Sequence, residues 1–332
     1  MDRQRELINT IHDQLEKAGN ILVVSHIRPD GDAIGSVLGI GLSLLGIGKD
    51  VQMVFSDEVP DNFRFLAGSE LVKTGPIGKV DYIIVVDSSD MERTDPVLNG
   101  FGTPDLNIDH HKTNTNFAKT NLVESEAIAT AEILAKYLPA FGLNITKPVA
   151  DALLTGIVTD TIGFRTTNVN PQALRITASL IESGANLADI YYRTIVEQSY
   201  AAARYWGAGL SKLRMEAGLV WTTLTLKERQ AAGYPYRDDA DLVKILSAIE
   251  GAKIAVILTE QSQGYVKISW RLCGSLSTDL DVSEIAQKFG GGGHKAAAGA
   301  DLKGKLEEIV EQVLSDTRIS MKKVDKPVPE VR

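Results

Sequence analysis

The chain has 332 residues, a net charge of -8, 44% hydrophobic residues and a single cysteine, Cys273. This composition excludes an intrinsically disordered protein, a disulfide-stapled scaffold and a duplex DNA binder with a broadly basic surface. The apolar runs are shorter than the roughly 18 to 20 residues that span a bilayer, so no membrane partner is expected. Residues 1–19 are charged throughout and lack the apolar centre of a secretory signal, which predicts a cytoplasmic protein.

The N-terminal part predicts an α/β fold with a mainly parallel sheet. Apolar residues at helical spacing indicate a first helix over residues 3–18. The runs "ILVVSH" at 21–26, "YIIVVDSSD" at 82–90 and "LNIDHH" at 106–111 predict buried parallel strands, because they are continuous rather than alternating. Crossover helices, expected on both faces of the sheet, are predicted over residues 33–45, 126–138 and 148–159.

The C-terminal part has a different pattern of predicted elements. Helices are predicted from Pro171, which follows the capping residue Asn170, to about residue 213. The segments "GLVWTTLTL", "AKIAVILTE" and "GYVKISWRL" then predict strands, and "QSQG" joins the last two as a hairpin. We therefore expect an N-terminal domain over 1–184, a helical connector over 185–213 and a smaller mixed α/β domain over 214–332.

Acids and histidines follow the predicted strands. The turn "SHIRPDGDAIGS" carries His26, Asp30 and Asp32, and carboxylates this close repel each other unless a cation lies between them. In open α/β sheets the carboxyl ends of the strands form the ligand-binding edge, so further candidates should gather there. These further candidates are Asp87, Asp109, His110, His111 and Asp160.

The candidate set favours a pair of divalent cations. Imidazole and carboxylate ligands without a thiolate suit Mn²⁺, Mg²⁺ or Fe²⁺ better than a structural zinc site. Eight candidates exceed what one octahedral ion needs, whereas two ions could share a bridging carboxylate at about 3.5 to 4 Å, which favours phosphoryl chemistry. Taken singly, Asp30, Asp87 or Asp160 is better explained as a helix cap or turn residue, and the histidine pair could be a packing feature at the edge of the core; the metal interpretation depends on the set as a whole.

The segment "FGGGGHKAAAG" at 289–299 is a second candidate site. Four glycines before a histidine let backbone N–H groups approach an anion, and the helical pattern ahead of them favours an ordered loop over a flexible linker. In the strand "VKISWRL", alternation separates two faces. One face carries Lys267, Ser269 and Arg271, and the other carries Val266, Ile268 and Trp270. Trp270 is therefore expected in the core, while Arg271 could reach a phosphate.

In order along the chain, "SHIRPDGDAIGS", "VVDSSD", "NIDHHKTN" and "GIVTDTIGFRTTN" resemble the four motifs of the DHH phosphoesterases. The family takes its name from the triplet found here at Asp109, His110 and His111. "FGGGGHKAAAGA" is similar to the signature of the C-terminal substrate domain associated with that family, so the resemblance extends over residues 25–300. Within the family, the chain is most similar to the oligoribonuclease and PAP phosphatase branch, the nanoRNases.

The resemblance implies a role for each site residue. One Mn²⁺ would be held by His26, Asp30 and Asp87, and the other by Asp32, Asp87, His110 and Asp160. Asp87 would be the bridge, Asp109 would orient His110, and His111 would contact the scissile phosphate, so Asp87, Asp109 and His111 form the expected catalytic group. The expected substrate-binding residues are His111, Arg165, Arg271, Gly292, Gly293 and His294.

The expected activity is Mn²⁺-dependent hydrolysis of short oligoribonucleotides or dinucleotides to 5′-mononucleotides, together with removal of the 3′-phosphate of PAP. Mg²⁺, Co²⁺ or Fe²⁺ are expected substitutes. Alternatives left open are a cyclic-di-AMP phosphodiesterase, a pyrophosphatase or exopolyphosphatase, and a nucleotide-sensing binding protein without catalysis. The expected partners are short single-stranded oligoribonucleotides or nucleotide phosphates, not duplex DNA, and a homodimer is left open.

Overall fold

The computed structural model describes residues 2–76, 78–94, 96–274 and 279–324. The chain divides into two compact units, Met1–Glu197 and Gln198–Arg332, which have separate hydrophobic cores. The division falls inside the segment 185–213 that was expected as a connector, and residues 325–332 of the expected second domain lie outside the described residues. No helix within the described ranges is long and apolar enough to cross a membrane.

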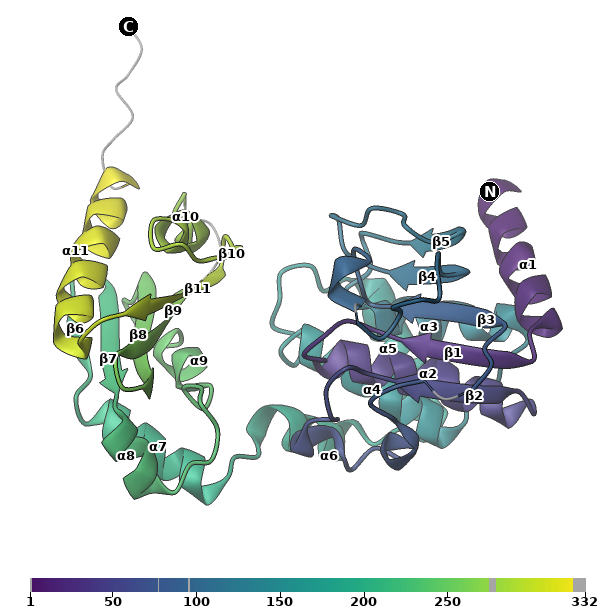
Figure 1. The fold of residues 1–332 in the computed structure, drawn as a ribbon, viewed down its shortest axis with the longest axis horizontal. Helices are drawn as coiled ribbons and strands as arrows, with labels where there is room; N and C mark the ends of the chain where they lie inside the picture. Colours follow the sequence, from purple (N-terminus) through teal and green to yellow (C-terminus); the bar gives the residue numbers. More distant parts are fainter. Residues whose placement is uncertain (1, 77, 95, 275–278, 325–332) are drawn as a thin grey trace, which may run out of the picture. The chain divides into compact units, whose positions relative to one another are not determined.

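The first unit alternates strands and helices along the chain (Figure 1). Its strands are β1 (Asn20–Val24), β2 (Asp50–Val54), β3 (Tyr82–Val86), β4 (Leu106–Asp109) and β5 (Thr120–Val123). Its α-helices are α1 (Asp2–Lys17), α2 (Gly31–Gly46), α3 (Thr130–Tyr137), α4 (Lys147–Asp160), α5 (Pro171–Glu182) and α6 (Leu187–Tyr191). Its shorter turns are η1 (Asp61–Phe63), η2 (Ser69–Leu71), η3 (Glu92–Thr94), η4 (Leu138–Phe141) and the π-helical η5 (Tyr192–Val196). The predicted strands and helices are confirmed, although α3 begins four residues later than 126.

The five strands of this unit form one parallel sheet in the order β2-β1-β3-β4-β5. Continuous burial explains the parallel arrangement, because all of Tyr82–Val86 is buried and such strands are covered on both faces. From β1 the chain passes to β2 on one side and then to β3 on the other. Ligands of open α/β sheets bind at this kind of reversal, outside the carboxyl ends of the strands.

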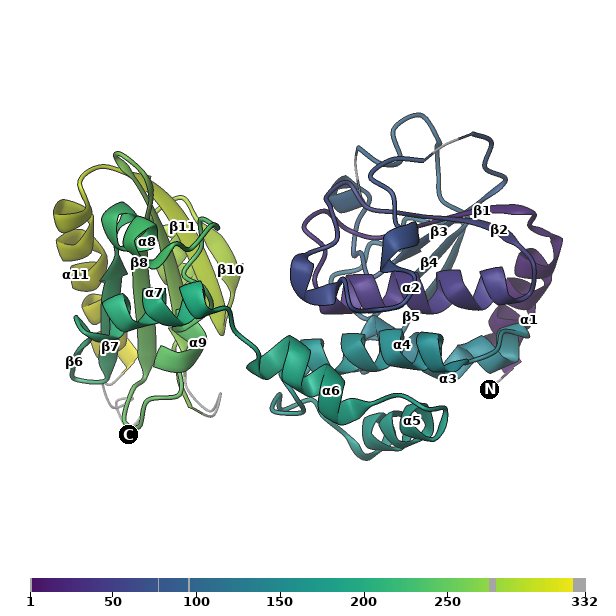
Figure 2. The same ribbon diagram turned by 90° about the horizontal axis from the view of Figure 1, so that it is seen from below.

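The two faces of this sheet are covered differently. One face, which carries Val23 and Ile84, packs against α1, α2, α3 and α4 in the larger core, and Figure 2 shows α2 and α4 running along the sheet. The other face, which carries Leu22 and Val85, packs against the loop that contains Leu98. A crossover helix was expected on this second face, but the described residues between β3 and β4 contain the short turn η3 and no α-helix. The α/β class itself is confirmed.

The second unit is a smaller mixed α/β domain. Its strands are β6 (Arg214–Glu216), β7 (Leu219–Leu224), β8 (Ile254–Ser262), β9 (Tyr265–Leu272), β10 (Gly292–His294) and β11 (Ala297–Lys303). Its helices are α7 (Tyr200–Leu210), α8 (Leu226–Ala232), α9 (Leu242–Leu246), α10 (Val282–Gln287) and α11 (Leu306–Val324). The strand order is β10-β11-β9-β8-β7-β6, and β7 and β8 form its parallel pair.

Alternation along β9 fixes the orientation of this second sheet. Val266, Ile268 and Trp270 are buried against α10 and α11, as predicted from their period of two. The indole nitrogen of Trp270 donates a hydrogen bond to the hydroxyl of Thr317 at 3.1 Å, which satisfies its polar atom within the core. The opposite face of the sheet packs against α7, α8 and α9 in a separate core.

Candidate active site

Three neighbouring strands deliver acids and histidines to one edge of the first sheet. His26 follows β1, Asp87 follows β3, and Asp109 ends β4 directly before His110 and His111. Because β1, β3 and β4 are adjacent and parallel, their carboxyl ends lie at the same edge. The convergence expected from the sequence is therefore present in the fold.

The first group at this edge consists of His26, Asp30 and Asp87, whose ligand atoms all lie within 4.8 Å of one another. The His26 Nε2 is 3.5 Å from the Asp87 Oδ2 and 3.8 Å from the Asp30 Oδ2. The His26 Nδ1 is 2.8 Å from the carbonyl oxygen of Ile27, which fixes the ring so that Nε2 faces the acids. This geometry could hold one metal ion.

The second group surrounds His110. Its Nε2 is 4.0 Å from the Asp32 Oδ2, 3.8 Å from the Asp87 Oδ1 and 3.9 Å from the Asp160 Oδ2. The His110 Nδ1 is 3.3 Å from the carbonyl oxygen of Ala127, which orients the ring. The two oxygens of Asp87 therefore face different groups, as a bridging carboxylate requires.

Burial and mutual repulsion shift the pKa values of the acids in this cluster. Burial raises the pKa of Asp32 well above its usual range, and repulsion from the neighbouring carboxylates adds to the effect. Burial also raises the pKa of Asp160 to about 6, although His110 opposes this. Despite burial, the pKa of Asp87 is lowered because His26 and His110 lie beside it.

This donor set fits a bound divalent cation. Among the described residues, the basic partners within ion-pair distance of Asp30, Asp32, Asp87 and Asp160 are histidines, not lysine or arginine. Repelling carboxylates with imidazoles as their basic partners favour a cation between them. Nitrogen and oxygen donors without sulfur match Mn²⁺, Mg²⁺ or Fe²⁺.

Local packing places Asp30 and Asp32. Asp30 caps α2, because its Oδ1 accepts hydrogen bonds from the backbone N–H groups of Asp32 and Ala33 at 3.1 and 3.0 Å. The helix-cap interpretation therefore holds for one oxygen of Asp30, while the other faces His26. Asp32 is 2% exposed and lies against Gly156 of α4, where an added Cβ would be 2.7 Å from the Asp32 Oδ1. A glycine lets α4 approach this closely.

Asp109 contacts a different histidine from the expected one. Its Oδ1 is 2.7 Å from the Nδ1 of His111, whereas His110 is oriented by Ala127. β4 ends at Asp109, and a turn follows at residues 112–113, so it is the His111 ring, two residues on, that lies against the carboxylate. The Asp109 Oδ2 accepts a hydrogen bond from the Asn114 amide at 2.6 Å. Asp109 therefore positions the expected phosphate-contacting residue.

Two side chains of the site were not predicted. Asn114 lies inside the motif "NIDHHKTN" but had no assigned role, although its proximity to the triplet was a usable signal. Thr130 opens α3, and its hydroxyl donates a hydrogen bond to the Asp87 Oδ1 at 3.0 Å. This contact joins positions 43 residues apart, and no local pattern in the sequence marks it.

The expected substrate residues of the second unit lie on β9 and β10, the two strands that flank β11. Ala297 of β11 pairs with Arg271 of β9 on one side and with His294 of β10 on the other. Residues paired directly across strands share a face, so the side chains of Arg271 and His294 lie on one face, two strand spacings or about 10 Å apart. Among the described residues, no group accepts a hydrogen bond from the buried Nε of Arg271.

The glycines of the second unit have a structural role of their own. Gly293 has a φ of 146°, and a Cβ at this position would lie 2.5 Å from the carbonyl oxygen of Ala297. The tight pairing of β10 with β11 therefore demands glycine there. Gly292 has open space around its Cα and is exposed, so it remains free to approach a ligand.

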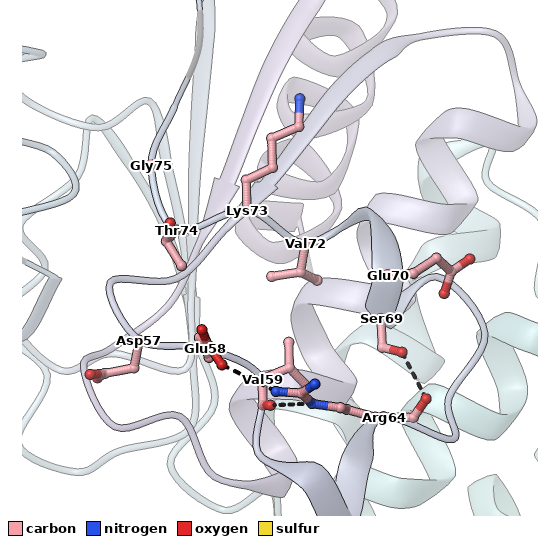
Figure 3. Close-up of a pocket in the computed structure, with 10 residues that line it drawn as sticks. All are labelled: Asp57, Glu58, Val59, Arg64, Ser69, Glu70, Val72, Lys73, Thr74 and Gly75. Atoms are coloured by element: carbon pink, nitrogen blue, oxygen red, sulfur yellow. Dashed lines mark hydrogen bonds and ion pairs between the residues drawn. The ribbon is translucent and has the colours of Figure 1, made fainter.

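Neither Arg165 nor a hollow in the first unit belongs to the two ligand groups. Arg165 is an exposed residue in the loop after α4, five positions beyond Asp160. A hollow of about 780 Å³ lies beyond the carboxyl end of β2, and its lining includes Asp57 and Arg64 (Figure 3). Arg64 is already bound by the Glu58 carboxylate at 3.2 Å, as Figure 3 shows, so it is not poised to hold a phosphate. We therefore place the candidate site at the acids and histidines.

Known families match both parts of the chain. The DHH family, N-terminal domain, matches residues 20–157, and the DHHA1 domain matches residues 232–317. The first match contains the histidines and most acids of the candidate site, and the second contains Arg271 and His294. The chain belongs to the DHH family and is a phosphoesterase of that family.

Individual relatives are similar over nearly the whole chain. The bifunctional oligoribonuclease and PAP phosphatase NrnA of Thermus thermophilus is 35% identical over 305 residues, which are 90% of this chain and 90% of the relative. The crystal structure of an exopolyphosphatase-related protein from Bacteroides fragilis has a TM-score of 0.87 at 26% identity, covering 97% of this chain and 98% of that chain. RecJ from Thermus thermophilus, in complex with Mn²⁺, shares the fold with a TM-score of 0.55 at 14% identity, covering 98% of this chain and 56% of that chain.

Proposed function

We propose that this phosphoesterase hydrolyses short oligoribonucleotides and dinucleotides to 5′-mononucleotides and removes the 3′-phosphate of PAP. The observation that carries the proposal is the position of Asp87, whose two carboxylate oxygens face two separate groups of potential ligands. The 35% identical oligoribonuclease and PAP phosphatase supports the choice of substrate. Two-cation sites bridged by a carboxylate are typical of enzymes that attack phosphorus.

The residues of the first unit would divide between two Mn²⁺ ions. His26, Asp30 and Asp87 would hold one ion, and Asp32, Asp87, His110 and Asp160 would hold the other. When bound, such a pair supplies a water of lowered pKa and offsets the charge that builds up on the phosphate oxygens. Mg²⁺, Co²⁺ and Fe²⁺ are the substitutes that the donor atoms allow.

His111 would act on the substrate rather than on a cation. Its Nδ1 is held by Asp109, so its Nε2 is free, and 31% of its side chain is exposed. The hydrogen bond that the His111 Nδ1–H donates to Asp109, more than any other contact, raises the pKa of His111 and favours the protonated ring. A protonated imidazole in this position would donate a hydrogen bond to a non-bridging oxygen of the scissile phosphate.

The second unit would bind the end of the substrate. Arg271 and His294 share a sheet face, and we propose that they hold a terminal phosphate, with Gly292 and Gly293 allowing close backbone approach. Arg165 would contact the substrate backbone from the first unit. A chain with a net charge of -8 cannot attract long duplexes through a broad basic surface, so the proposed substrates are short and single-stranded.

Substrate assays with added and withdrawn metal test this proposal. The purified chain would be incubated with pApA, PAP, cyclic-di-AMP and pyrophosphate, each with Mn²⁺ and each with EDTA. We expect 5′-AMP from pApA and from PAP in the presence of Mn²⁺ and no product with EDTA. Turnover of pyrophosphate or cyclic-di-AMP alone would refute the proposed substrate class, and full activity in EDTA would refute the metal requirement.

A further inference from the structure

Thr130 joins two buried acids of the candidate site, Asp87 and Asp32. It is the first residue of α3, it is completely buried, and its hydroxyl donates a hydrogen bond to the Asp87 Oδ1 at 3.0 Å. Its backbone N–H donates to the Asp32 Oδ2 at 2.6 Å, and the next N–H, that of Ala131, donates to the Asp32 Oδ1 at 2.9 Å. One helix start therefore contacts carboxylates that come from the α2 helix and the end of β3.

The Asp87 carboxylate needs an external contact to fix its orientation. The terminal torsion of an aspartate is broad and nearly two-fold, so the backbone alone does not decide which oxygen faces which group. The hydroxyl of Thr130 marks Oδ1 as the oxygen on the side of His110, and Oδ2 is left facing His26 at 3.5 Å. A carboxylate oxygen has two lone pairs, so Oδ1 can accept this hydrogen bond and still bind a cation.

We propose that Thr130 is a positioning residue that holds the Asp87 carboxylate in the orientation required to serve two cations at once. This inference rests on the proposed function, because the orientation matters only if Asp87 binds metal. Residues that hydrogen-bond metal ligands commonly change metal affinity by about 10- to 100-fold when they are removed. Thr130 is buried, so its hydroxyl is not available to contact substrate.

Two substitutions separate the hydroxyl of Thr130 from the rest of its side chain, and a third serves as the control. Thr130→Val removes the hydroxyl and keeps the branched shape, and it leaves the backbone N–H on Asp32. Thr130→Ser keeps the hydroxyl and loses the methyl group. Thr222→Val is the matched control, because Thr222 is 1% exposed and its hydroxyl donates to the Gly209 carbonyl at 2.6 Å in the second unit.

The measurement is calorimetric titration of Mn²⁺ into the metal-free full-length chain. Thr130→Val should weaken binding of at least one of the two ions about tenfold or more, while Thr130→Ser and Thr222→Val stay within about threefold of the unmodified protein. If the valine variant does not fold, Thr130→Ala carries the same expectation without a methyl group beside Asp87.

Different results would contradict the positioning role of Thr130 and the proposed function. Wild-type affinity and stoichiometry in the hydroxyl-free variant, or equal losses in the serine variant, would overturn the positioning role while the proposed function stands. A wild-type chain that binds no Mn²⁺ would instead overturn the proposed function, and the positioning role with it.

Discussion

At the scale of single residues, Asp87 is the most constrained part of the site. Its φ of 54° lies in the left-handed region, which costs a residue other than glycine about 1 to 3 kcal/mol unless the surroundings hold it. Its backbone N–H donates to the Ile108 carbonyl at 2.9 Å, and the hydroxyl of Thr130 holds its side chain. Strained backbone is concentrated at functional positions in proteins. Here the strained conformation places the Asp87 carboxylate between the two ligand groups.

The pair Asp109 and His111 gives a prediction at this scale. The Asp109 Oδ1 lies 2.7 Å from the His111 Nδ1 and raises the pKa of that imidazole, so Asp109→Asn should lower it. The charged form of His111 would then disappear at a lower pH. Proton NMR titration of the metal-free protein measures this directly, because the chain has five histidines and His111→Gln identifies the signal.

A control for this titration lies at the other end of the same strand. Asp105 precedes β4 and forms an ion pair with Lys119 at 2.8 Å. Asp105→Asn therefore removes a carboxylate and leaves the Asp109–His111 pair unchanged. It should leave the pKa of His111 unchanged. An unchanged pKa in the Asp109→Asn variant would mean that the hydrogen bond between Asp109 and His111 does not form in solution.

At the scale of elements, close helix packing shapes the site. α2 and α4 approach each other through glycines, and a Cβ at Gly35 would lie 2.4 Å from the carbonyl oxygen of Ala152. The same approach brings Gly156 against Asp32 and lets α4 deliver Asp160 from its last residue. The helix pair is therefore part of the ligand geometry and not merely a cover for the sheet.

Gly156→Ala tests this element directly. The new Cβ would meet the Ala131 Cβ at 2.6 Å and the Asp32 Oδ1 at 2.7 Å, so the packing must shift. Overpacking of this kind costs about 1 to 3 kcal/mol of unfolding free energy, and we also expect weaker Mn²⁺ binding. Urea unfolding of the metal-free protein and Mn²⁺ titration provide the two readouts.

The matched control is Gly46→Ala at the end of α2, where an added Cβ meets nothing within 4 Å. It should change stability by less than about 1 kcal/mol and leave metal binding intact. A Gly156→Ala variant that behaves like this control in both measurements would contradict the close packing of α4 against Asp32.

In the first sheet, the interior strands were predictable from the sequence and the edge strands were not. β1, β3 and β4 lie inside the sheet, so both faces are buried and their apolar runs are continuous. β2 and β5 are the edge strands, and β2 includes the partly exposed Gln52 and the exposed Asp50, which interrupt such a run. Most of the candidate ligand residues could be proposed from the sequence because they follow the interior strands, whereas Asp160 is the last residue of α4.

Contacts between residues far apart in the chain could not be predicted from the sequence. The start of α3 was expected near residue 126, but residues 125–128 form a turn and a bend, and α3 begins after the extended Ala129, with its first N–H groups on Asp32. The contact between Thr130 and Asp32 spans 98 positions, and it exists only because the sheet and α3 fold together. The partner of Asp109 was likewise decided by the turn after β4.

At the scale of the whole molecule, the two units divide the proposed tasks. The first unit contains the acids and histidines, and the second contains Arg271 and His294 on one face of its own sheet. Both units are present in the 35% identical relative, which matches 90% of this chain. The proposed activity therefore requires the complete chain rather than the first unit alone.

Arg271→Ala tests this division of tasks. Loss of the guanidinium should raise the KM for pApA about tenfold or more and leave the Mn²⁺ content unchanged, because charge-assisted hydrogen bonds to phosphate are strong. Steady-state kinetics and elemental analysis give the two values. Lys267→Ala is the control, since Lys267 is exposed on the same face of β9 and has no proposed contact with substrate.

A reduced metal content in the Arg271→Ala variant would contradict the separation of the two units' tasks. An unchanged KM would show that Arg271 does not bind the substrate phosphate. Either result would leave the geometry of the first unit standing, because that geometry depends on the strands of the first sheet.

The central claim is that Asp87 lies between two cations, and anomalous X-ray scattering at the manganese edge tests it most directly. Crystals of the full chain soaked in Mn²⁺ should show two anomalous peaks, one on each side of the Asp87 carboxylate and about 3.5 to 4 Å apart. One peak should lie beside His26 and the other beside His110. A single peak, or no anomalous density at this edge of the sheet, would contradict the claim that Asp87 bridges two ions.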